Sequence, residues 1–258
     1  MLARLYVFSD LWFNRLLKAI KASHQGLWLG LLSRADMQEV ASRQYGDGAQ
    51  YRSDAHNLRG LFDWEAEAID GHFANGCRVL VASAGGGREL LALAKRNFHV
   101  AGFECQFDLV ATSRRLLAEA GIQAQVEQAE PDRVPQGMGQ HDALLLGWGA
   151  YIHIIGREAR IAFLREFGQH GPVGAPLLMS FFVRQPQSRH FHWVRRLAQF
   201  LRRLRRDPGS LELGDTMDST FDHYFTEDEV RGELVAGGFE LLQFNDLPFG
   251  HAIARKLA

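Results

Sequence analysis

RVLVASAGGGRE occupies residues 78–89 and joins an apolar run to three successive glycines. The apolar run, Arg78 to Ser83, has the length of a buried strand, and apolar residues recur at helical spacing from Arg88 to Arg96. A strand that turns through glycines into a helix lets a ligand touch the backbone and brings the free N–H groups of the helix N-terminus toward it. The segment therefore predicts a nucleotide-like ligand, although the same turn also serves for plain packing of a helix on a strand.

Short apolar runs continue to alternate with helical stretches up to the end of the chain. The further predicted strands cover residues 100–104, 123–128, 142–146, 176–183, 239–244 and 252–256, and the helices cover residues 107–120, 157–167 and 226–236. Alternation of this kind is typical of parallel strands joined by helices. We therefore expect an α/β fold built on a doubly wound, seven-stranded, mostly parallel sheet.

The composition excludes several classes of protein. The 258 residues are 47% hydrophobic and 23% charged, which excludes wholesale disorder. Because 29 Lys and Arg stand against 30 Asp and Glu, no overall field draws the chain to nucleic acid, and a nucleic-acid partner is not expected. Cys77 and Cys105 are too few for a disulfide framework, so we expect a reducing, cytoplasmic compartment. The 11 histidines show no metal-ligand spacing, and no metal site is predicted.

The second strand of the sheet ends on a carboxylate, Glu104, which lies 17 residues beyond Gly87. An acid at this place can accept hydrogen bonds from both hydroxyls of a ribose, and the alternative is a solvated acid at a strand end. Leu90 replaces the third glycine of a dinucleotide fingerprint, and the Gly-Lys-Ser/Thr of a phosphate-binding loop is absent. An adenosine without phosphates is the ligand that remains.

Four segments carry a resemblance to a known family: residues 79–89, Glu104, residues 142–153 and residues 224–257. Together they resemble a class I S-adenosylmethionine-dependent methyltransferase, apart from a charged insertion. The resemblance implies the class I methyltransferase fold, with S-adenosyl-L-methionine as the cofactor. In that fold the last predicted helix and the final two strands would form the closing reversed hairpin of the sheet.

The resemblance also implies which residues contact the cofactor. Ser83, Ala84, Gly85 and Gly87 are implied to contact its methionine part, Glu104 its ribose, Cys105, Gln128 and Ala129 its adenine, and Gly147 and Trp148 again the methionine side. Val81 stands where the family usually has an acid, and Ser83 replaces the first glycine of the loop. The cofactor's ammonium group is therefore expected to find another partner. Gln128 replaces the usual acid after the third strand, unless Glu127 or Glu130 takes that role.

Residues 1–72 precede the α/β domain, residues 73–258, and are expected to form a helical cap or lid. Residues 10–23 have the pattern of an amphipathic helix, with Leu16, Leu17 and Ile20 on one face. We expect this face to pack on its own domain, and an anchor at a membrane surface is the alternative.

Aromatic residues and glycines at 45–51 and 57–65 fit a segment that folds over cofactor and substrate. By the resemblance, Tyr45, Tyr51 or Arg59 could reach the methionine carboxylate. A surface loop with buried aromatics is the alternative reading of the same residues.

Residues 184–222 interrupt the alternation and are predicted to form a helical insertion after the fifth strand that adds to the cap. Seven arginines lie between Arg189 and Arg206 beside an apolar stripe at helical spacing, and an acidic segment follows. We expect these arginines to pair with the acidic segment or to face water. Recognition of an acidic substrate, an anionic lipid surface or RNA are the alternatives, so peripheral membrane contact stays open without being favoured. The basic helix of the insertion and the apolar N-terminal helix could each form a homodimer interface, and neither pattern decides between a monomer and a dimer.

Residues that follow the fourth strand are placed to meet a substrate, because parallel strands present their carboxyl ends at one edge of the sheet. His153 is a candidate general base near neutral pH, or else a residue that caps or packs. Tyr151 is a second catalytic candidate and is more simply a wall of the pocket. His223 is a third candidate, on its position alone.

The expected function is methyl transfer to an O or N atom of a small organic substrate, in line and beneath the cap. Because a sulfonium already carries a good leaving group, most of the catalysis would be positioning, with a base needed only if the nucleophile must lose a proton. One alternative is an enzyme of the same fold that transfers an aminopropyl group or cyclises the methionine part, releasing methylthioadenosine. Another alternative is a binding module without catalysis.

Overall fold

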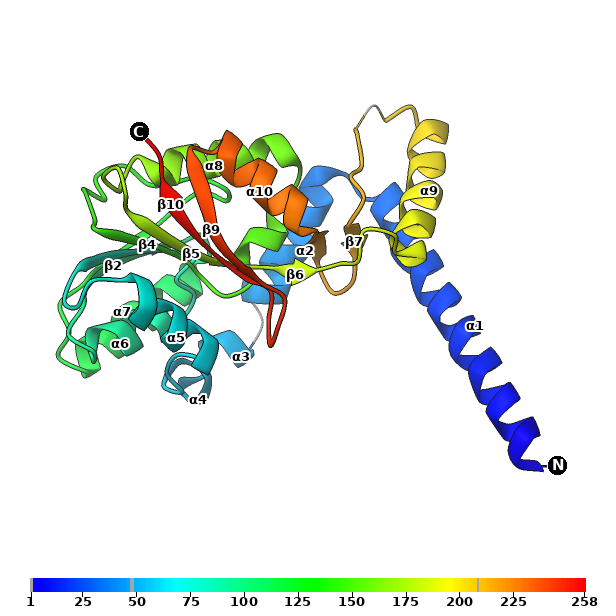
Figure 1. The fold of residues 1–258 in the computed structure, drawn as a ribbon, viewed down its shortest axis with the longest axis horizontal. Helices are drawn as coiled ribbons and strands as arrows, with labels where there is room; N and C mark the ends of the chain where they lie inside the picture. The colour runs from blue at the N-terminus through cyan, green and yellow to red at the C-terminus, as the bar shows by residue number, and fades with distance from the viewer. Residues whose placement is uncertain (1, 47–48, 208) are drawn as a thin grey trace.

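The computed structural model describes residues 2–46, 49–207 and 209–258 (Figure 1). Its main sheet has seven strands in the order β3-β2-β1-β4-β5-β10-β9. The strands are β1 (Arg78–Ala82), β2 (His99–Glu104), β3 (Gln125–Gln128), β4 (Ala143–Leu146), β5 (Pro176–Ser180), β9 (Phe239–Asn245) and β10 (His251–Lys256). The first five are parallel, and β10 runs antiparallel to both β5 and β9. The predicted fold class, including the reversed hairpin at the end, is confirmed.

Helices cover both faces of the sheet (Figure 1). On one face α5 (Asp63–His72), α6 (Arg88–Ala94) and α7 (Phe107–Glu119) form a core with Val79 and Val81 of β1. On the other face α8 (Arg157–Gly168) and α10 (Glu227–Ala236) pack with Leu80 and Ala82 of the same strand. Successive side chains of a strand point to opposite faces, so the unbroken apolar run of β1 fits a strand buried on both sides.

The predicted strand 176–183 divides between two sheets. After β5 the chain leaves the main sheet, and β6 (Phe182–Val183) pairs with β8 (Phe221–Phe225), which also pairs with β7 (Asp215–Met217). The insertion is therefore a helix, α9 (Arg189–Leu204), followed by a small second sheet, rather than a helix alone.

Helix α1 (Leu2–Leu31) is longer than predicted, and α2 (Arg34–Gly46) follows it directly. Only the C-terminal part of α1 is buried, against α9, where Gly26 and Gly30 allow close approach. A Cβ added to Gly30 would lie 2.8 Å from the Cβ of Leu201. Residues 2–21 are exposed, and Figure 1 shows this part of α1 extending away from the α/β domain.

The expectation that the apolar face of residues 10–23 packs on its own domain is therefore wrong. Leu16, Leu17 and Ile20 are 43%, 46% and 56% exposed. The amphipathic pattern is real, but it predicts a helix and not what covers the helix. None of the described helices combines the length and the apolar character needed to cross a bilayer.

Most arginines from 189 to 206 face water, which is one of the two expected arrangements, and Arg184 pairs with Glu229 of the acidic segment. Among the described residues from 189 to 206, Arg202 has the one ion pair, with Asp207 at 4.0 Å. Arg202 also donates to the carbonyl oxygen of Leu29, and Arg205 donates to the carbonyl oxygens of Gly30 and Leu31. These two arginines therefore cap the C-terminus of α1, where the helix dipole favours cations.

Candidate functional site

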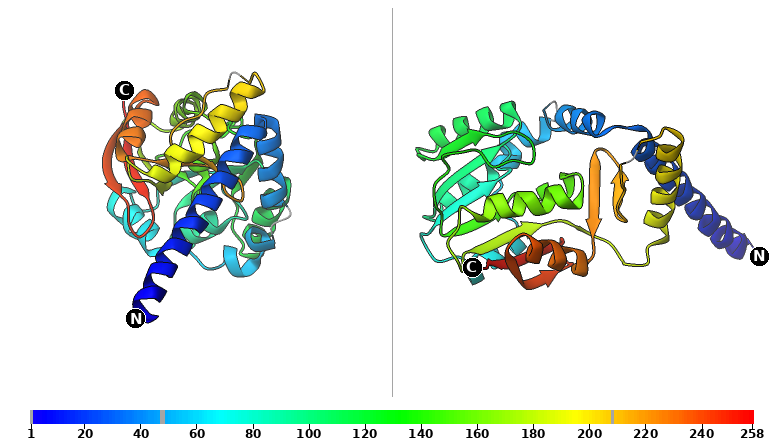
Figure 2. Two further views of the ribbon diagram at one scale, coloured as in Figure 1. Left: turned by 90° about the vertical axis from the view of Figure 1, so that its right-hand side faces the viewer. Right: turned by 90° about the horizontal axis from the view of Figure 1, so that it is seen from above.

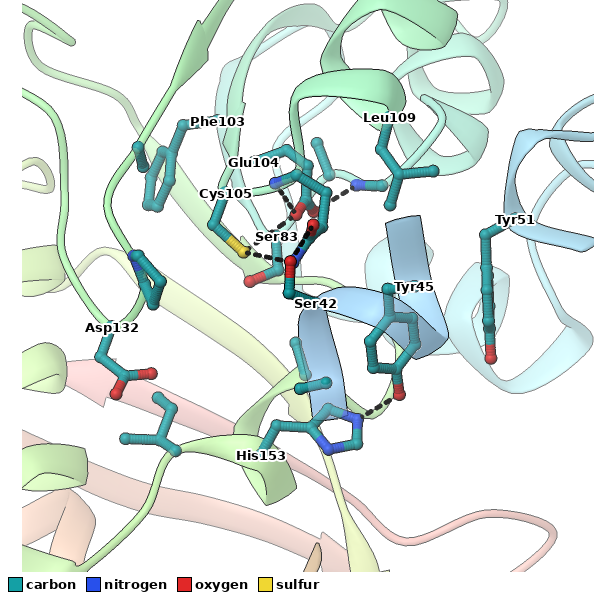
Figure 3. A pocket seen from close by; sticks show the side chains of 18 of the residues that line it. Ser42, Tyr45, Tyr51, Ser83, Phe103, Glu104, Cys105, Leu109, Asp132 and His153 are labelled. Atoms are coloured by element: carbon teal, nitrogen blue, oxygen red, sulfur yellow. Dashed lines mark hydrogen bonds between the residues drawn. The ribbon is translucent and has the colours of Figure 1, made fainter. Parts of the chain in front are cut away.

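A pocket of about 320 Å³ opens at the carboxyl ends of β1, β2 and β4 (Figure 3). The sheet side of the pocket is formed by the glycine loop at 83–86, the end of β2 at 103–106, the loop at 129–133 and Trp148. The opposite side comes from α2, with Met37, Ala41 and Tyr45, and from the short helices α3 (Ala49–Arg52) and α4 (Asp54–Asn57). The volume suits a small organic ligand, for which sites of ~300–1,000 Å³ are typical.

Most of the residues expected at the site line this pocket, and others do not. The residues that line it are Tyr45, Tyr51, Ser83, Ala84, Gly85, Glu104, Cys105, Ala129, Trp148 and His153. Those outside it are Arg59, Gly87, Gln128, Gly147, Tyr151 and His223. The glycine loop, the end of β2 and the segment after β4 thus come together as expected, while several individual positions differ.

Glu104 joins the end of β2 to the glycine loop. Its Oε2 accepts a hydrogen bond from the backbone N–H of Gly85 at 3.0 Å, and its Oε1 accepts one from the N–H of Gln106 at 2.9 Å. The side chain is nearly buried yet borders the pocket, as Figure 3 shows. Burial, together with the neighbouring Glu104, raises the pKa of the Cys105 thiol beside it. The pocket therefore holds one oriented carboxylate and one neutral thiol at this end.

Ser83 adopts the left-handed backbone conformation, with a φ of 51°. This is the conformation that glycine adopts without a penalty and that costs other residues roughly 1–2 kcal/mol. The backbone of Ser83 packs directly against Gly147, since a Cβ added to Gly147 would lie 2.3 Å from the carbonyl oxygen of Ser83. Ser83 thus adopts a backbone conformation that favours glycine, and Gly147 contributes close approach rather than a pocket surface.

The N-terminal segment closes directly over the glycine loop. A Cβ added to Gly86 would lie 2.4 Å from the Nδ2 of Asn57 and 2.5 Å from the carbonyl oxygen of Tyr51. Asn57 is buried, and its Nδ2 donates to the carbonyl oxygens of Tyr51 and Ser53. Its Oδ1 is buried without a hydrogen-bond partner although Asn57 lines the pocket. A buried acceptor of this kind needs a donor, which a ligand can supply.

A buried ion cluster stands beneath this contact at the start of α6. The Arg88 guanidinium lies 2.6 Å from carboxylate oxygens of both Glu65 and Glu89. Although burial opposes the charge, the two carboxylates raise the pKa of Arg88, so it stays protonated. Glu89 also accepts a hydrogen bond from the N–H of Trp148 at 3.3 Å, and both Arg88 and Glu89 line the pocket. Two acids around one base leave this end of the pocket negative, which suits a bound cation.

His153 and Tyr45 meet at the other end of the pocket (Figure 3). The Nε2 of His153 lies 2.6 Å from the phenolic oxygen of Tyr45. Its Nδ1 lies 3.0 Å from the carbonyl oxygen of Phe221 and 3.2 Å from the Oδ1 of Asp222. Burial raises the pKa of Tyr45, so its phenol is protonated near neutral pH. The Nδ1 nitrogen therefore donates, and Nε2 is free to accept the phenolic proton.

Tyr151 and His223, two of the three catalytic candidates, do not reach the pocket. Tyr151 is fully buried, and its hydroxyl donates to Glu233 at 2.7 Å. His223 is fully buried with its Nδ1 2.6 Å from the Oδ1 of Asp215. The segment after β4 is a 3₁₀ helix, η1 (Ala150–His153), in which residues three apart share a face. His153 therefore shares the pocket face with Ala150, while Tyr151 points into the core.

Arg59 also lies outside the pocket, with its guanidinium 4.5 Å above the ring of Phe62. Conversely, several polar residues of the pocket were not predicted from the sequence, among them Asn57, Arg88, Glu89 and Asp132. The signal for Arg88 and Glu89 was present, since both follow the three glycines and open α6. Asn57 begins the segment 57–65 that was expected to fold over the ligand, although the expectation named its aromatic residues and glycines, and nothing in the local sequence of Asp132 indicates a pocket. Among the described residues, no group of three His, Cys, Asp or Glu side chains could hold a metal ion.

Comparison with known proteins gives matches among solved structures alone. No protein-family model matches the chain, and no curated protein matches it. Among solved structures, an S-adenosylmethionine-dependent methyltransferase from Methanosarcina mazei superposes with a TM-score of 0.59 at 18% identity, covering 77% of this chain and 99% of that one. A 1,6-didemethyltoxoflavin-N1-methyltransferase from Burkholderia thailandensis, with S-adenosylhomocysteine bound, superposes with a TM-score of 0.61 at 17% identity. The superposition covers 88% of this chain and 92% of that one.

A sugar N-methyltransferase from a Streptoalloteichus species gives a TM-score of 0.58 at 15% identity, covering 81% of this chain and 91% of that chain. At these identities the likeness concerns the fold. The chain has the class I S-adenosylmethionine-dependent methyltransferase fold over most of its length, as its sequence leads one to expect.

Proposed function

We propose that this chain is a methyltransferase that binds S-adenosylmethionine at the glycine loop and methylates an O or N atom of a small organic substrate. The observation that carries the proposal is the pairing of Glu104 with the N–H of Gly85, which sets an oriented carboxylate against the glycine loop at the carboxyl edge of the sheet. Ligands of open α/β sheets bind at this edge. The structural neighbours named for toxoflavin and sugar methylation support a small substrate.

The residues of the pocket fit the cofactor. Glu104 would hold the ribose hydroxyls, and Cys105 and Ala129 border the space for the adenine. The orphaned Oδ1 of Asn57 and the carboxylate of Glu89 would receive the ammonium group, and they would compensate for Val81 at the usual acidic position. When bound, the cofactor supplies an electrophilic methyl group on a sulfonium. Everything else that the reaction needs, orientation and a path for a proton, belongs to the chain.

His153 is the proposed general base, with Tyr45 between it and the substrate. As a hydroxyl or neutral amine nucleophile attacks, the proton that it loses passes to the phenolic oxygen of Tyr45 while the Tyr45 proton passes to the Nε2 of His153. Asp222 then stabilises the imidazolium through Nδ1. Tyr45 thus returns to a protonated phenol at the end of the transfer, and no free phenolate is required.

The cap is proposed to consist mainly of α2, α3 and α4. These helices supply most of the pocket's outer wall, whereas of the described residues in the insertion at 184–222 only Phe221 lines it. Exclusion of water by such a cap would favour in-line transfer.

The experiment that tests the proposal is incubation of the purified protein with S-adenosylmethionine and candidate amine and hydroxyl acceptors, followed by identification of the nucleoside product. Formation of S-adenosylhomocysteine supports methyl transfer. Methylthioadenosine as the product would instead indicate aminopropyl transfer or cyclisation. No product with any acceptor, together with retained cofactor binding, would favour a binding module.

A further inference from the structure

The strongest feature outside the pocket is a surface formed by α1 and α9, which we call the α1–α9 surface. It consists of the exposed residues 2–21 of α1 and the exposed side of α9 around Trp193, Phe200 and Leu204. Figure 2 shows both helices at one end of the molecule, with the start of α1 projecting beyond it. Neither helix belongs to the pocket, so an inference about this surface does not depend on the proposed function.

Helix α1 carries most of its exposed apolar side chains on one half. At about 100° per residue, Leu5, Trp12, Phe13, Leu16, Leu17 and Ile20 fall on one half of the helix, and all are more than two-fifths exposed. Arg4, Arg15, Lys18 and Lys21 fall on the other half, together with the exposed apolar side chains of Val7, Phe8 and Leu11. An exposed apolar face this long is unusual on a soluble surface and marks an interaction site.

Helix α9 continues the same pattern. Trp193 and Phe200 are 51% and 56% exposed, and Leu204 lies on the same side of the helix. Arg189, Arg196 and Arg203, spaced by seven residues, flank this apolar stripe and have no ion-pair partner among the described residues. Long arginine side chains beside exposed aromatics can extend to anionic groups at a polar interface while the aromatics enter an apolar layer.

One hydrogen bond establishes that the two apolar faces join. The Nε1 of Trp193 donates to the Oγ of Ser23 at 3.1 Å. On α1, Ser23 stands between the packed side, where Gly26 and Gly30 contact α9, and the apolar side that holds Leu16 and Ile20. The stripe of α9 therefore lies on the same side of the pair as the apolar face of α1.

Charge identifies the occupant of the surface. The two helices carry nine Lys and Arg and one acid, Asp10, whereas the whole chain is balanced at 29 against 30. A second copy of this chain would bring like charges together, and RNA would leave the apolar face in water. An anionic bilayer satisfies both features, since amphipathic basic helices lie in the interface with the apolar side among the acyl chains.

We propose that the α1–α9 surface binds the surface of anionic phospholipid membranes without spanning them. The apolar face of α1 and the Trp193–Phe200 stripe enter the bilayer interface, and the flanking arginines contact lipid phosphates. This reverses the expectation from sequence that membrane contact is the less favoured use of these helices.

The test is flotation of the full-length protein with vesicles of phosphatidylglycerol and phosphatidylcholine, and with phosphatidylcholine vesicles alone. We expect binding to the anionic vesicles that weakens at least 10-fold at 0.5 M salt, because Lys and Arg near an anionic surface are screened by salt. Leu16→Gln with Ile20→Gln should weaken the binding at least 10-fold. Arg196→Gln with Arg203→Gln should weaken it and reduce the salt dependence.

The matched control is Leu242→Gln with Val235→Gln, which changes two comparably exposed apolar residues on β9 and α10. This control should bind as the unaltered protein does, and circular dichroism checks that each variant keeps its helices. Absence of binding to anionic vesicles, equal binding to neutral ones, or an equal loss in the control would overturn the proposal. So would a stable dimer or an RNA complex that is lost in the Leu16 and Ile20 variant while vesicles are not bound.

Discussion

The Nε2 of His153 lies 2.6 Å from the phenolic oxygen of Tyr45, and the Nδ1 of the same ring faces Asp222 at 3.2 Å. Tyr45 comes from α2, which belongs to the proposed cap, and His153 comes from the 3₁₀ helix η1 after β4, so the pair needs α2 in this position. In the proposed mechanism, closure of the cap would therefore assemble the proton path.

Removing the proton path should reduce turnover without affecting cofactor affinity. We expect His153→Gln and Tyr45→Phe each to lower kcat by about 10²- to 10⁴-fold, the range of general acid–base catalysis, once an acceptor has been identified. The control is His72→Gln, an exposed histidine on α5. Full activity of both pocket variants would show that the substrate reacts without a base from this pair.

The contact between Asn57 and Gly86 should govern closure of the cap. Gly86→Ala places a Cβ 2.4 Å from the Nδ2 of Asn57, so we expect the cap to be displaced and cofactor affinity to fall about 10-fold or more. Gly71→Ala is the matched change, because nothing lies within 4 Å of its added Cβ. Titration calorimetry with both variants, and proteolysis to follow the exposure of α3 and α4, measures the effect. Equal affinities would mean that the cap does not contribute to binding.

The ion cluster of Arg88, Glu65 and Glu89 should be essential for stability. Arg88→Met leaves two buried carboxylates without their cation, which is expected to lower the free energy of unfolding by about 3–5 kcal/mol in urea titrations. Arg96→Met, which breaks the exposed pair with Asp70, should cost less than about 1 kcal/mol. Similar losses for the two variants would contradict the assignment of a buried cluster.

The backbone strain at Ser83 should appear in stability measurements. Replacing Ser83 by glycine removes roughly 1–2 kcal/mol of strain from the left-handed conformation, while the added chain entropy of the unfolded state costs about 0.5–1 kcal/mol. Ser83→Gly should therefore be neutral or slightly stabilising. Ser83→Val should be destabilising, since a β-branched residue tolerates this conformation poorly. Thermal unfolding of both variants decides the matter, and equal melting temperatures would argue against the observed φ.

The raised pKa of Cys105 predicts a thiol that reacts slowly with alkylating reagents. Because burial and the carboxylate of Glu104 both disfavour the thiolate, less thiolate is present at pH 8 than for a free cysteine. In a Cys77→Ser background, iodoacetamide should therefore label Cys105 slowly at pH 8, and the rate should still be rising above pH 9. A plateau below pH 9 would contradict the shift.

The sequence predicts the sheet well because its signals are local. The run at β1, the glycines and the capping box of Thr226 with Glu229 on α10 each depend on neighbours within a few residues. Strands β7 and β8 escape prediction, since they bury Asp215, Asp222 and His223 where strand patterns lead one to expect apolar residues. Asp215 bonds to His223 on the paired strand, and Asp222 faces His153 far along the chain, and a pattern of alternating apolar residues encodes neither partner.

The site is predictable in part for the same reason. Glu104 and the glycine loop are predictable because both stand at the ends of predicted strands. His153 and Tyr151 lie two residues apart, and only the turn of the 3₁₀ helix decides which of them faces the pocket. Asn57 reaches the pocket through the packing of α4 on Gly86, which links positions 29 residues apart. The extension of α1 shows the converse, because its pattern is clear and its partner is not encoded in it.

Binding of S-adenosylmethionine to the unaltered protein and to Glu104→Ala, measured by calorimetry, tests the central claim most directly. Glu127→Ala at the neighbouring strand β3 serves as the control, since its carboxylate lies outside the pocket. We predict micromolar binding that weakens about 10- to 100-fold in Glu104→Ala, as expected for hydrogen bonds to a charged group, and that stays unchanged in Glu127→Ala. No binding by the unaltered protein, or equal binding by Glu104→Ala, would contradict the claim that the glycine loop and Glu104 form the cofactor site.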